Sequence, residues 1–88
     1  MNEDYSELTV VIPVYQEDVR TVENLYHLVI ESGAQCIVIN DGGDMNLTIP
    51  HVSYTPNMGY GYALKAGIDK SNTRLICMAD GDGQHTFQ

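Results

Sequence analysis

Basic side chains are scarce in this sequence. Only 4 Lys and Arg residues stand against 12 Asp and Glu residues among 88, which leaves a formal net charge of -8 at pH 7. A chain this acidic repels phosphate backbones and anionic lipid at long range. Nucleic acid and membrane surfaces are therefore not expected as its direct partners.

Long apolar runs are also missing. The longest hydrophobic stretches cover residues 8–14 and 36–39, far fewer than the roughly 20 residues that cross a bilayer. The acidic start, Met1-Asn2-Glu3-Asp4, lacks the positive region and apolar core of an export signal. We therefore expect a cytoplasmic protein with no direct membrane insertion by this segment, or a membrane-peripheral one in a full-length parent.

Cysteine is limited to Cys36 and Cys77, which lie inside apolar runs without metal-ligand spacing. In a reducing compartment such residues are expected to be core thiols and not a disulfide. Hydrophobic residues at 43% and charged residues at 18% are near globular averages. The chain is therefore expected to fold as a single domain over residues 1–88 with one modest core.

The apolar pattern alternates between strand-like and helix-like segments. Runs rich in β-branched residues predict buried strands at 8–14 and 35–40, a weaker strand at 51–55 and a fourth strand at 74–79. Three- and four-residue spacing predicts amphipathic helices over 17–32, capped by Gly33, and over 57–71, with Asn57 as N-cap. The expected packing stripes are Val22, Leu25, Tyr26, Val29 and Ile30 in the first helix, and Ala63, Leu64, Gly67 and Ile68 in the second.

Strands that alternate with helices predict an α/β fold with a three-layer parallel sheet in the order 3-2-1-4 and helices on both faces. In that order the chain changes direction between the first and fourth strands, and ligands bind outside the carboxyl ends of the strands at this point. Tyr15, Glu17, Asp41 and the segment 80–82 each follow a predicted strand. These residues are therefore expected to gather at one rim of the sheet.

Two carboxylates two positions apart, Asp80 and Asp82, lie on one side of an extended backbone and can share a divalent cation. The alternative is an ordinary acidic turn. For Asp41, a loop turn and a ligand contact are about equally compatible with the sequence alone. Gly59 and Gly61 either form a tight turn before a helix or let the backbone approach a ligand closely, and they make a poor dinucleotide fingerprint.

Four segments in order carry a further signal: Val11-Ile12-Pro13-Val14-Tyr15-Gln16-Glu17, Val38-Ile39-Asn40-Asp41-Gly42-Gly43, Asn57-x-Gly59-x-Gly61-x-Ala63-Leu64-x-x-Gly67, and Asp80-Gly81-Asp82-Gly83-Gln84-His85. Together they resemble the successive signatures of family 2 inverting glycosyltransferases. The similarity is greatest to the dolichyl- or polyprenyl-phosphate mannosyltransferase-like branch, and it extends over nearly the whole chain.

The resemblance implies a GT-A fold, Rossmann-like in its sheet, that binds a nucleotide-diphosphate sugar such as a UDP- or GDP-sugar. By this likeness Pro13, Tyr15 and Glu17 hold the base and ribose, and Asp41 contacts the base. Asp80 and Asp82 match the D-x-D pair, of which Asp82 chiefly holds Mg²⁺ or Mn²⁺ on the diphosphate. Gln84 matches a position that assists the metal or phosphate, and the glycines at 59 and 61 line the donor site.

The chain departs from the family pattern at Asn40, where relatives have an acidic residue, at Gly43, where they have serine, and at Tyr60, where they are often basic. Family members continue beyond the D-x-D motif with acceptor-site residues and a candidate base. We therefore expect the donor-binding part of a longer, truncated glycosyltransferase, inactive in transfer by itself. An unpaired fourth strand would favour a homo-oligomer that covers this sheet edge.

Two other functions fit parts of the sequence. A non-catalytic oligomerising module would keep the fold without the acceptor half and would show no response to nucleotides. A receiver-like phosphoryl-transfer domain would also hold Mg²⁺ with acidic residues at strand ends, but Lys65 and Lys70 both fall within the second predicted helix, so a convincingly placed lysine is missing.

Overall fold

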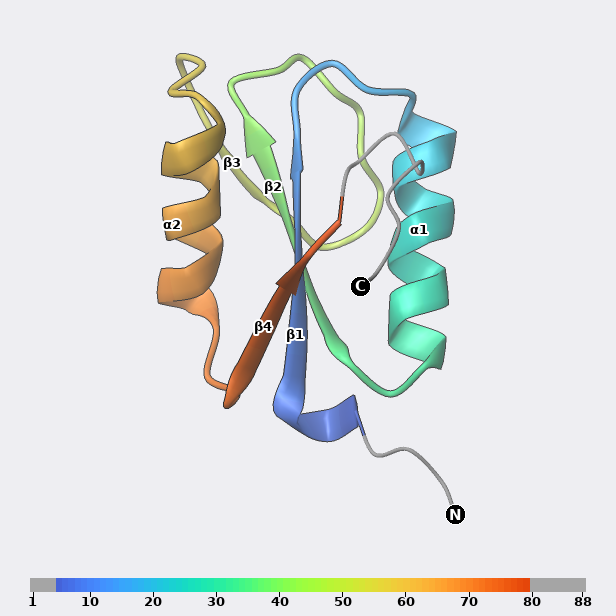
Figure 1. Ribbon diagram of the computed structural model, residues 1–88. Helices are drawn as coiled ribbons and strands as arrows, with labels where there is room; N and C mark the ends of the chain where they lie inside the picture. Colours follow the sequence, from blue (N-terminus) through green and yellow to red (C-terminus); the bar gives the residue numbers. More distant parts are fainter. Residues whose placement is uncertain (1–4, 80–88) are drawn as a thin grey trace.

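The computed structural model describes residues 5–79 (Figure 1). Along the chain its elements are a 3-10 turn at Tyr5–Glu7, β1 Leu8–Val14, α1 Val19–Glu31, β2 Gln35–Asp41, β3 Val52–Tyr54, α2 Tyr60–Lys70 and β4 Leu75–Met78. Within these residues, four parallel strands form one sheet in the order β3-β2-β1-β4, as the sequence predicts. The two helices lie on opposite faces of the sheet (Figure 1), so the fold is the expected three-layer α/β arrangement.

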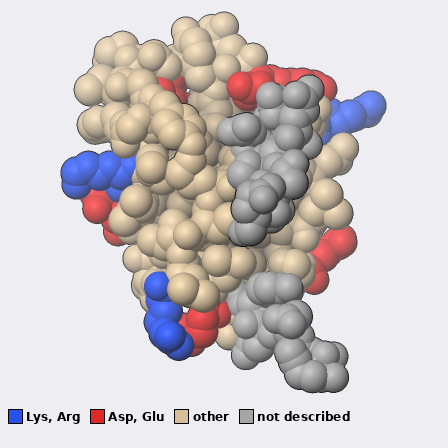
Figure 2. Space-filling model, in the orientation of Figure 1, with Lys and Arg blue, Asp and Glu red and all other residues tan. Residues whose placement is uncertain are grey.

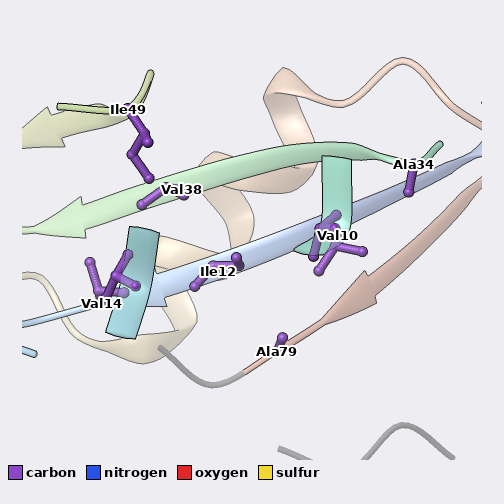
Figure 3. Close-up of a cluster of buried hydrophobic side chains, with 9 residues drawn as sticks. Val10, Ile12, Val14, Ala34, Val38, Ile49 and Ala79 are labelled. Atoms are coloured by element: carbon purple, nitrogen blue, oxygen red, sulfur yellow. The ribbon is translucent and has the colours of Figure 1, made fainter. Parts of the chain in front are cut away.

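Successive side chains of β1 point to opposite faces and are buried on both. Val10, Ile12 and Val14 belong to the core on the α1 side, and Val11 belongs to the core on the α2 side. Figure 3 shows the first three in a row along β1. Because both faces of a central parallel strand are covered, its sequence is continuously apolar and not alternating.

The α1-side core gathers residues from most of the chain. Val22 and Val29 of α1 pack against β1 and β2, and Ile49 joins them from the long connection between β2 and β3. Its buried members are Val10, Ile12, Val14, Val22, Val29, Ala34, Val38, Ile49 and Ala79. The connection 42–51 is thus anchored in the core although it is irregular.

The helix α2 approaches the sheet closely because two of its core-facing residues are small. Ala63 and Gly67 are buried, and a Cβ placed on Gly67 would overlap the side chain of Val11. This confirms the expectation that small residues at these positions permit close packing.

The two helix stripes are narrower than predicted. Ile30 and Ile68 are exposed, whereas their neighbours Val29 and Gly67 are buried. Consecutive helical residues are turned by about 100° from each other, so each isoleucine lies at the side of the buried stripe, with 42% of Ile30 and 43% of Ile68 exposed. Their inclusion in the packing stripes was wrong.

The helix ends differ in part from those predicted. Asp18, which was not a predicted cap, caps α1 and accepts a hydrogen bond from the Arg20 N–H at 3.3 Å. The C-cap of α1 is Ser32, and Gly33, the predicted cap, follows it with a φ of 97°. For α2, however, the N-cap is Gly59 and not Asn57. The predicted cap at Asn57 was wrong because its side chain is hydrogen-bonded to β2 instead.

The two cysteines flank β1 in neighbouring strands. Val10 is in register with Cys36 on one side and with Cys77 on the other, which separates the cysteines by two strand spacings, about 9.6 Å. A disulfide requires Cα atoms within about 7 Å of each other. Both thiols are free, and burial raises the pKa of Cys36 to about 12, which fits a thiol held inside the protein.

Candidate functional site

Loops that follow three strands meet at the carboxyl end of the sheet (Figure 1). A Cβ on Gly43, just after β2, would lie 3.0 Å from the Gln16 nitrogen and 3.5 Å from Cδ1 of Tyr15, just after β1. A Cβ on Gly42 would overlap the backbone of Asn57, which precedes α2. The segments around Tyr15, Asp41 and Gly59 are therefore neighbours, although they are far apart in the sequence.

Asp41 fastens the loop before α2 to the end of β2. Its Oδ1 accepts a hydrogen bond from the Met58 N–H, and its Oδ2 accepts one from the Gly59 N–H, each at 2.9 Å. The Asn57 side-chain amide donates to Oδ2 and to the Asp41 backbone carbonyl, again at 2.9 Å. With only 4% of its surface exposed, this carboxylate acts as an anchor that sets where α2 begins.

The charge of Asp41 is stabilised where it is buried. Burial by itself raises the pKa of this carboxyl, but Tyr54 and the N–H groups of Met58 and Gly59 lower it more, so the net pKa lies below its ordinary value. The start of α2 adds a favourable environment, because a helix N-terminus attracts negative charge. Asp41 is therefore ionised at neutral pH.

Tyr54 is the neighbour of Asp41 in β3, in direct register with it. Its hydroxyl oxygen is buried and has no hydrogen-bond partner within residues 5–79, yet burial and the nearby Asp41 carboxylate together raise its pKa. The hydroxyl and the carboxylate therefore interact electrostatically without a formed hydrogen bond. The Tyr54 ring also packs edge-on against Tyr62 of α2, with ring centroids 5.1 Å apart.

Asn40 supports the loop after β2 from within the sheet. Its side-chain nitrogen donates to the Gly43 carbonyl at 3.0 Å and to the Ser53 hydroxyl at 3.2 Å, while its oxygen accepts from the Gly43 N–H at 3.2 Å. An ionised carboxylate at this buried position could only accept. Asparagine fits this position because its side-chain amide both donates and accepts hydrogen bonds here.

The glycine positions of the site differ in whether a side chain could be accommodated there. Gly42, with a φ of 81°, has no room for a side chain against Asn57. Gly59 has a φ of 97°, where a side chain would be strained, although the space around it is open. Gly61 is exposed in the first turn of α2 and has open space around it, so neither packing nor backbone conformation demands glycine there.

The remaining predicted residues of this edge lie in and after β1. Pro13 is half-buried within β1, opposite Ile39. Tyr15 presents 46% of its surface, and Glu17 is half-buried in the loop before α1. Tyr15 is thus open to a ligand, whereas the Asp41 carboxylate is already bonded to the protein.

Three predicted donor or metal residues, Asp80, Asp82 and Gln84, lie outside the described residues. The strand that precedes them, β4, runs parallel to β1, and the Ala79 N–H donates to the Val11 carbonyl at 3.1 Å. Within residues 5–79, no group of three or more His, Cys, Asp or Glu side chains is placed to hold a metal ion. The same part of the chain contains no helix long and apolar enough to cross a membrane.

Sequence reasoning missed the roles of Asn40, Tyr54 and Asn57 at this edge. Each acts on a residue of another segment, and Asn57 is 16 positions from its partner Asp41. A polar residue beside a strand end is the only local signal for such contacts, and it is also the signal for a turn or a helix cap.

Comparisons of this chain with protein families, with curated proteins and with solved structures find no match. The α/β fold follows from the sheet topology itself, and the resemblance to glycosyltransferases stays a prediction from the motifs.

Proposed function

We propose that this chain binds a nucleotide-diphosphate sugar at the carboxyl end of its sheet, as the donor-binding part of a metal-dependent inverting glycosyltransferase. One observation carries the proposal: the segments around Tyr15, Asp41 and Gly59, which hold three of the four glycosyltransferase-like motifs, adjoin one another at that end. The fourth motif begins at Asp80, directly after the described residues.

The strand order supports a ligand at this end. The chain passes from β1 to β2 and β3 on one side of β1 and returns to β4 on its other side, so the strand order reverses direction between β1 and β4. In open parallel sheets, ligands bind outside the carboxyl ends of the strands at such a point. The exposed ring of Tyr15 follows β1, and the Asp80–Asp82 pair follows β4 in the sequence.

The proposed division of roles follows from the chemistry of each group. The Tyr15 ring would stack on the base, with Pro13 and Glu17 beside it, and Asp41 would hold the loop at Gly59 in place next to the ligand. Asp80, Asp82 and Gln84 carry oxygen atoms of the kind that Mg²⁺ and Mn²⁺ prefer. When bound, such a metal on the diphosphate would stabilise the charge of the departing nucleotide as a Lewis acid.

In the reaction, an acceptor oxygen would attack the anomeric carbon on the face opposite the diphosphate. The bond from that carbon to the diphosphate oxygen breaks, the nucleoside diphosphate leaves with the electron pair, and the configuration inverts. The acceptor must also lose its proton to a base. We assign no base within this chain and expect it to bind the donor without transferring sugar at a useful rate.

A second candidate is a non-catalytic module that self-associates through the β4 edge. Leu75 is 58% exposed and Ile76 is 40% exposed on this strand, and β4 pairs with β1 alone among the described strands. An edge strand of this kind can pair with another copy. This candidate predicts a homo-oligomer whose stability does not respond to nucleotides.

Thermal unfolding with nucleotide and metal separates the two candidates. We expect UDP or GDP together with Mn²⁺ to raise the Tm, because a ligand at 100 times its Kd stabilises the native state by about 2.7 kcal/mol. Asp82→Asn should abolish the metal-dependent part, whereas Asp44→Asn, at an exposed position after β2, should retain it. A Tm that neither nucleotide changes, with a mass above the monomer by light scattering, would support the module and contradict donor binding.

A further inference from the structure

A groove lies at the other end of the sheet from the candidate site. It has a volume of about 320 Å³ and is formed by the amino half of β2, the chain entering β3 and the end of α2. Its lining residues are Gln35, Cys36, Ile37, Val38, Pro50, His51, Val52, Lys70 and Asn72. None of them belongs to the proposed nucleotide site.

The groove runs along a stretch of β2 whose outer edge is unpaired. β3 is in register only with residues 39–41 of β2, while β1 pairs with β2 from Gln35 onward on the opposite side. Within residues 5–79, no strand pairs with 35–38 on the groove side. In a parallel sheet, alternate residues direct their N–H and C=O groups to each neighbour, so the backbone groups that this stretch directs toward the groove are paired with no strand within residues 5–79.

The chain between β2 and β3 leaves this edge open by passing around it. Ile49 packs in the α1-side core with Val38 (Figure 3), and three residues later Val52 packs on the α2 side. A contact of 2.8 Å between Nδ1 of His51 and the Ile49 carbonyl supports this crossing. Pro50, which has no N–H, cannot donate to β2 as it passes.

The charge of the groove differs from that of the whole chain. Lys70 lines it, and none of its lining residues within 5–79 is acidic, although the chain carries a formal charge of -8. On the side of the molecule where Figure 1 has α2, Figure 2 shows basic and acidic side chains next to one another, so the difference in charge is confined to the lining of the groove. Ile37 and Val52 add apolar surface, and Gln35 and Asn72 add hydrogen-bonding groups.

We propose that this groove binds an extended peptide segment with an acidic side chain, which adds a strand to the open edge of β2. Backbone hydrogen bonds to 35–38 would supply the pairing, as in other cases of strand addition. Small apolar side chains of the peptide would contact Ile37 and Val52, and its carboxylate would pair with Lys70. The partner is a peptide because the groove runs along a stretch of β2 that pairs with no strand on this side within residues 5–79, and it is acidic because the groove's side chains are basic or neutral.

The test is an NMR titration of the ¹⁵N-labelled chain with the acetylated and amidated heptapeptide TVTVTET, in which both Val side chains and the Glu side chain lie on one face of an extended strand. We expect amide shift changes centred on residues 35–38 and His51. The peptide TVTVTKT should bind more weakly, and TVTVTET with N-methylated backbone amides should not bind. Lys70→Glu should weaken TVTVTET binding about fivefold, the upper range for an exposed charge pair, and should favour TVTVTKT instead.

Lys65→Glu is the matched control, because Lys65 lies on the same helix, is exposed and does not line the groove. It should leave the affinity for TVTVTET unchanged. Equal binding of both peptides, or no shift change at 35–38, would overturn the proposal. So would concentration-dependent dimerisation that occupies these same residues, because the occupant would then be a second copy. None of these outcomes bears on nucleotide binding at the opposite end of the sheet.

Discussion

Replacement of Asp41 by asparagine changes one atom in the contact that joins β2 to the start of α2. The carboxylate accepts three hydrogen bonds through its two oxygens, from Met58, Gly59 and Asn57. An asparagine has one oxygen and one NH₂ group, so at least one of these donors must face another donor. The best orientation turns the NH₂ group toward Met58 and keeps the two bonds at the other oxygen.

The expected loss of stability follows from these bonds. A buried donor without a partner costs about 1–3 kcal/mol, and the two remaining bonds weaken because their acceptor is no longer charged. The easier burial of a neutral amide offsets part of this. We therefore expect Asp41→Asn to lower the free energy of unfolding at pH 7 by about 2 kcal/mol, equivalent to a Tm lower by about 10 °C for a domain of this size.

The dependence on pH gives this prediction a second test. The pKa of Asp41 lies below its ordinary value of 3.8 in the folded chain, so its ionised form stabilises the fold fully above that value. This contribution is lost as the pH falls through the lower folded pKa. The difference between the wild-type chain and Asp41→Asn should therefore be largest at pH 7 and should shrink below pH 3.8.

Urea unfolding followed by circular dichroism at several pH values measures this difference. Asp44→Asn is the control, because Asp44 is an exposed acidic residue three positions further along, and its substitution should change stability by less than about 0.5 kcal/mol. A variant at 41 as stable as the wild-type chain at pH 7, or a difference that stays constant into the acid range, would refute the anchoring role of this carboxylate.

Two further predictions concern the packing of α2 and the connection 42–51. Gly67→Ala should destabilise the chain by about 1–2 kcal/mol, because overlap with Val11 outweighs the better helix propensity of alanine. Gly61→Ala in the same helix should instead stabilise the chain by up to about 1 kcal/mol. Equal effects of the two substitutions in thermal unfolding would contradict the close packing at Gly67. The Glu23 carboxylate accepts from the Thr48 N–H at 2.7 Å and from its hydroxyl at 2.8 Å, and these bonds lower its pKa. These hydrogen bonds are therefore present above the ordinary pKa of 4.5 and are lost as the pH falls through the lower folded pKa. The Thr48 amide should accordingly titrate in NMR spectra with a midpoint below 4.5, and Glu23→Gln should remove that titration. An amide that titrates equally in both chains would show that another group is responsible.

Local patterns predicted the sheet and helices because each depends on burial that the sequence displays directly. The continuous apolar run of β1 indicated a strand covered on both faces, and the structure buries Val10, Val11 and Ile12 on alternate sides of it. The alternation of strands and helices then limited the topology to a parallel sheet with few possible orders. The observed order confirmed the one predicted.

Local patterns did not predict the contacts at the carboxyl end of the sheet. Asn57 is a good helix N-cap by residue type, but its side-chain amide donates to the carbonyl and the carboxylate of the distant Asp41 instead. Likewise, the third strand was predicted over 51–55 and is formed only by Val52–Tyr54, which is in register with residues 39–41 of β2. Both differences depend on how the connection 42–51 folds back, and neither composition nor periodicity encodes that path.

NMR spectra of the ¹⁵N-labelled chain with GDP or UDP and Mg²⁺ would locate a bound donor nucleotide by residue. The proposed function predicts amide shift changes at Tyr15, Gly43 and Gly59 and at positions 80–84, together with local broadening at 80–84 when Mn²⁺ replaces Mg²⁺. Spectra that neither nucleotide changes at these positions, with the metal in excess, would contradict a nucleotide-sugar site in this chain.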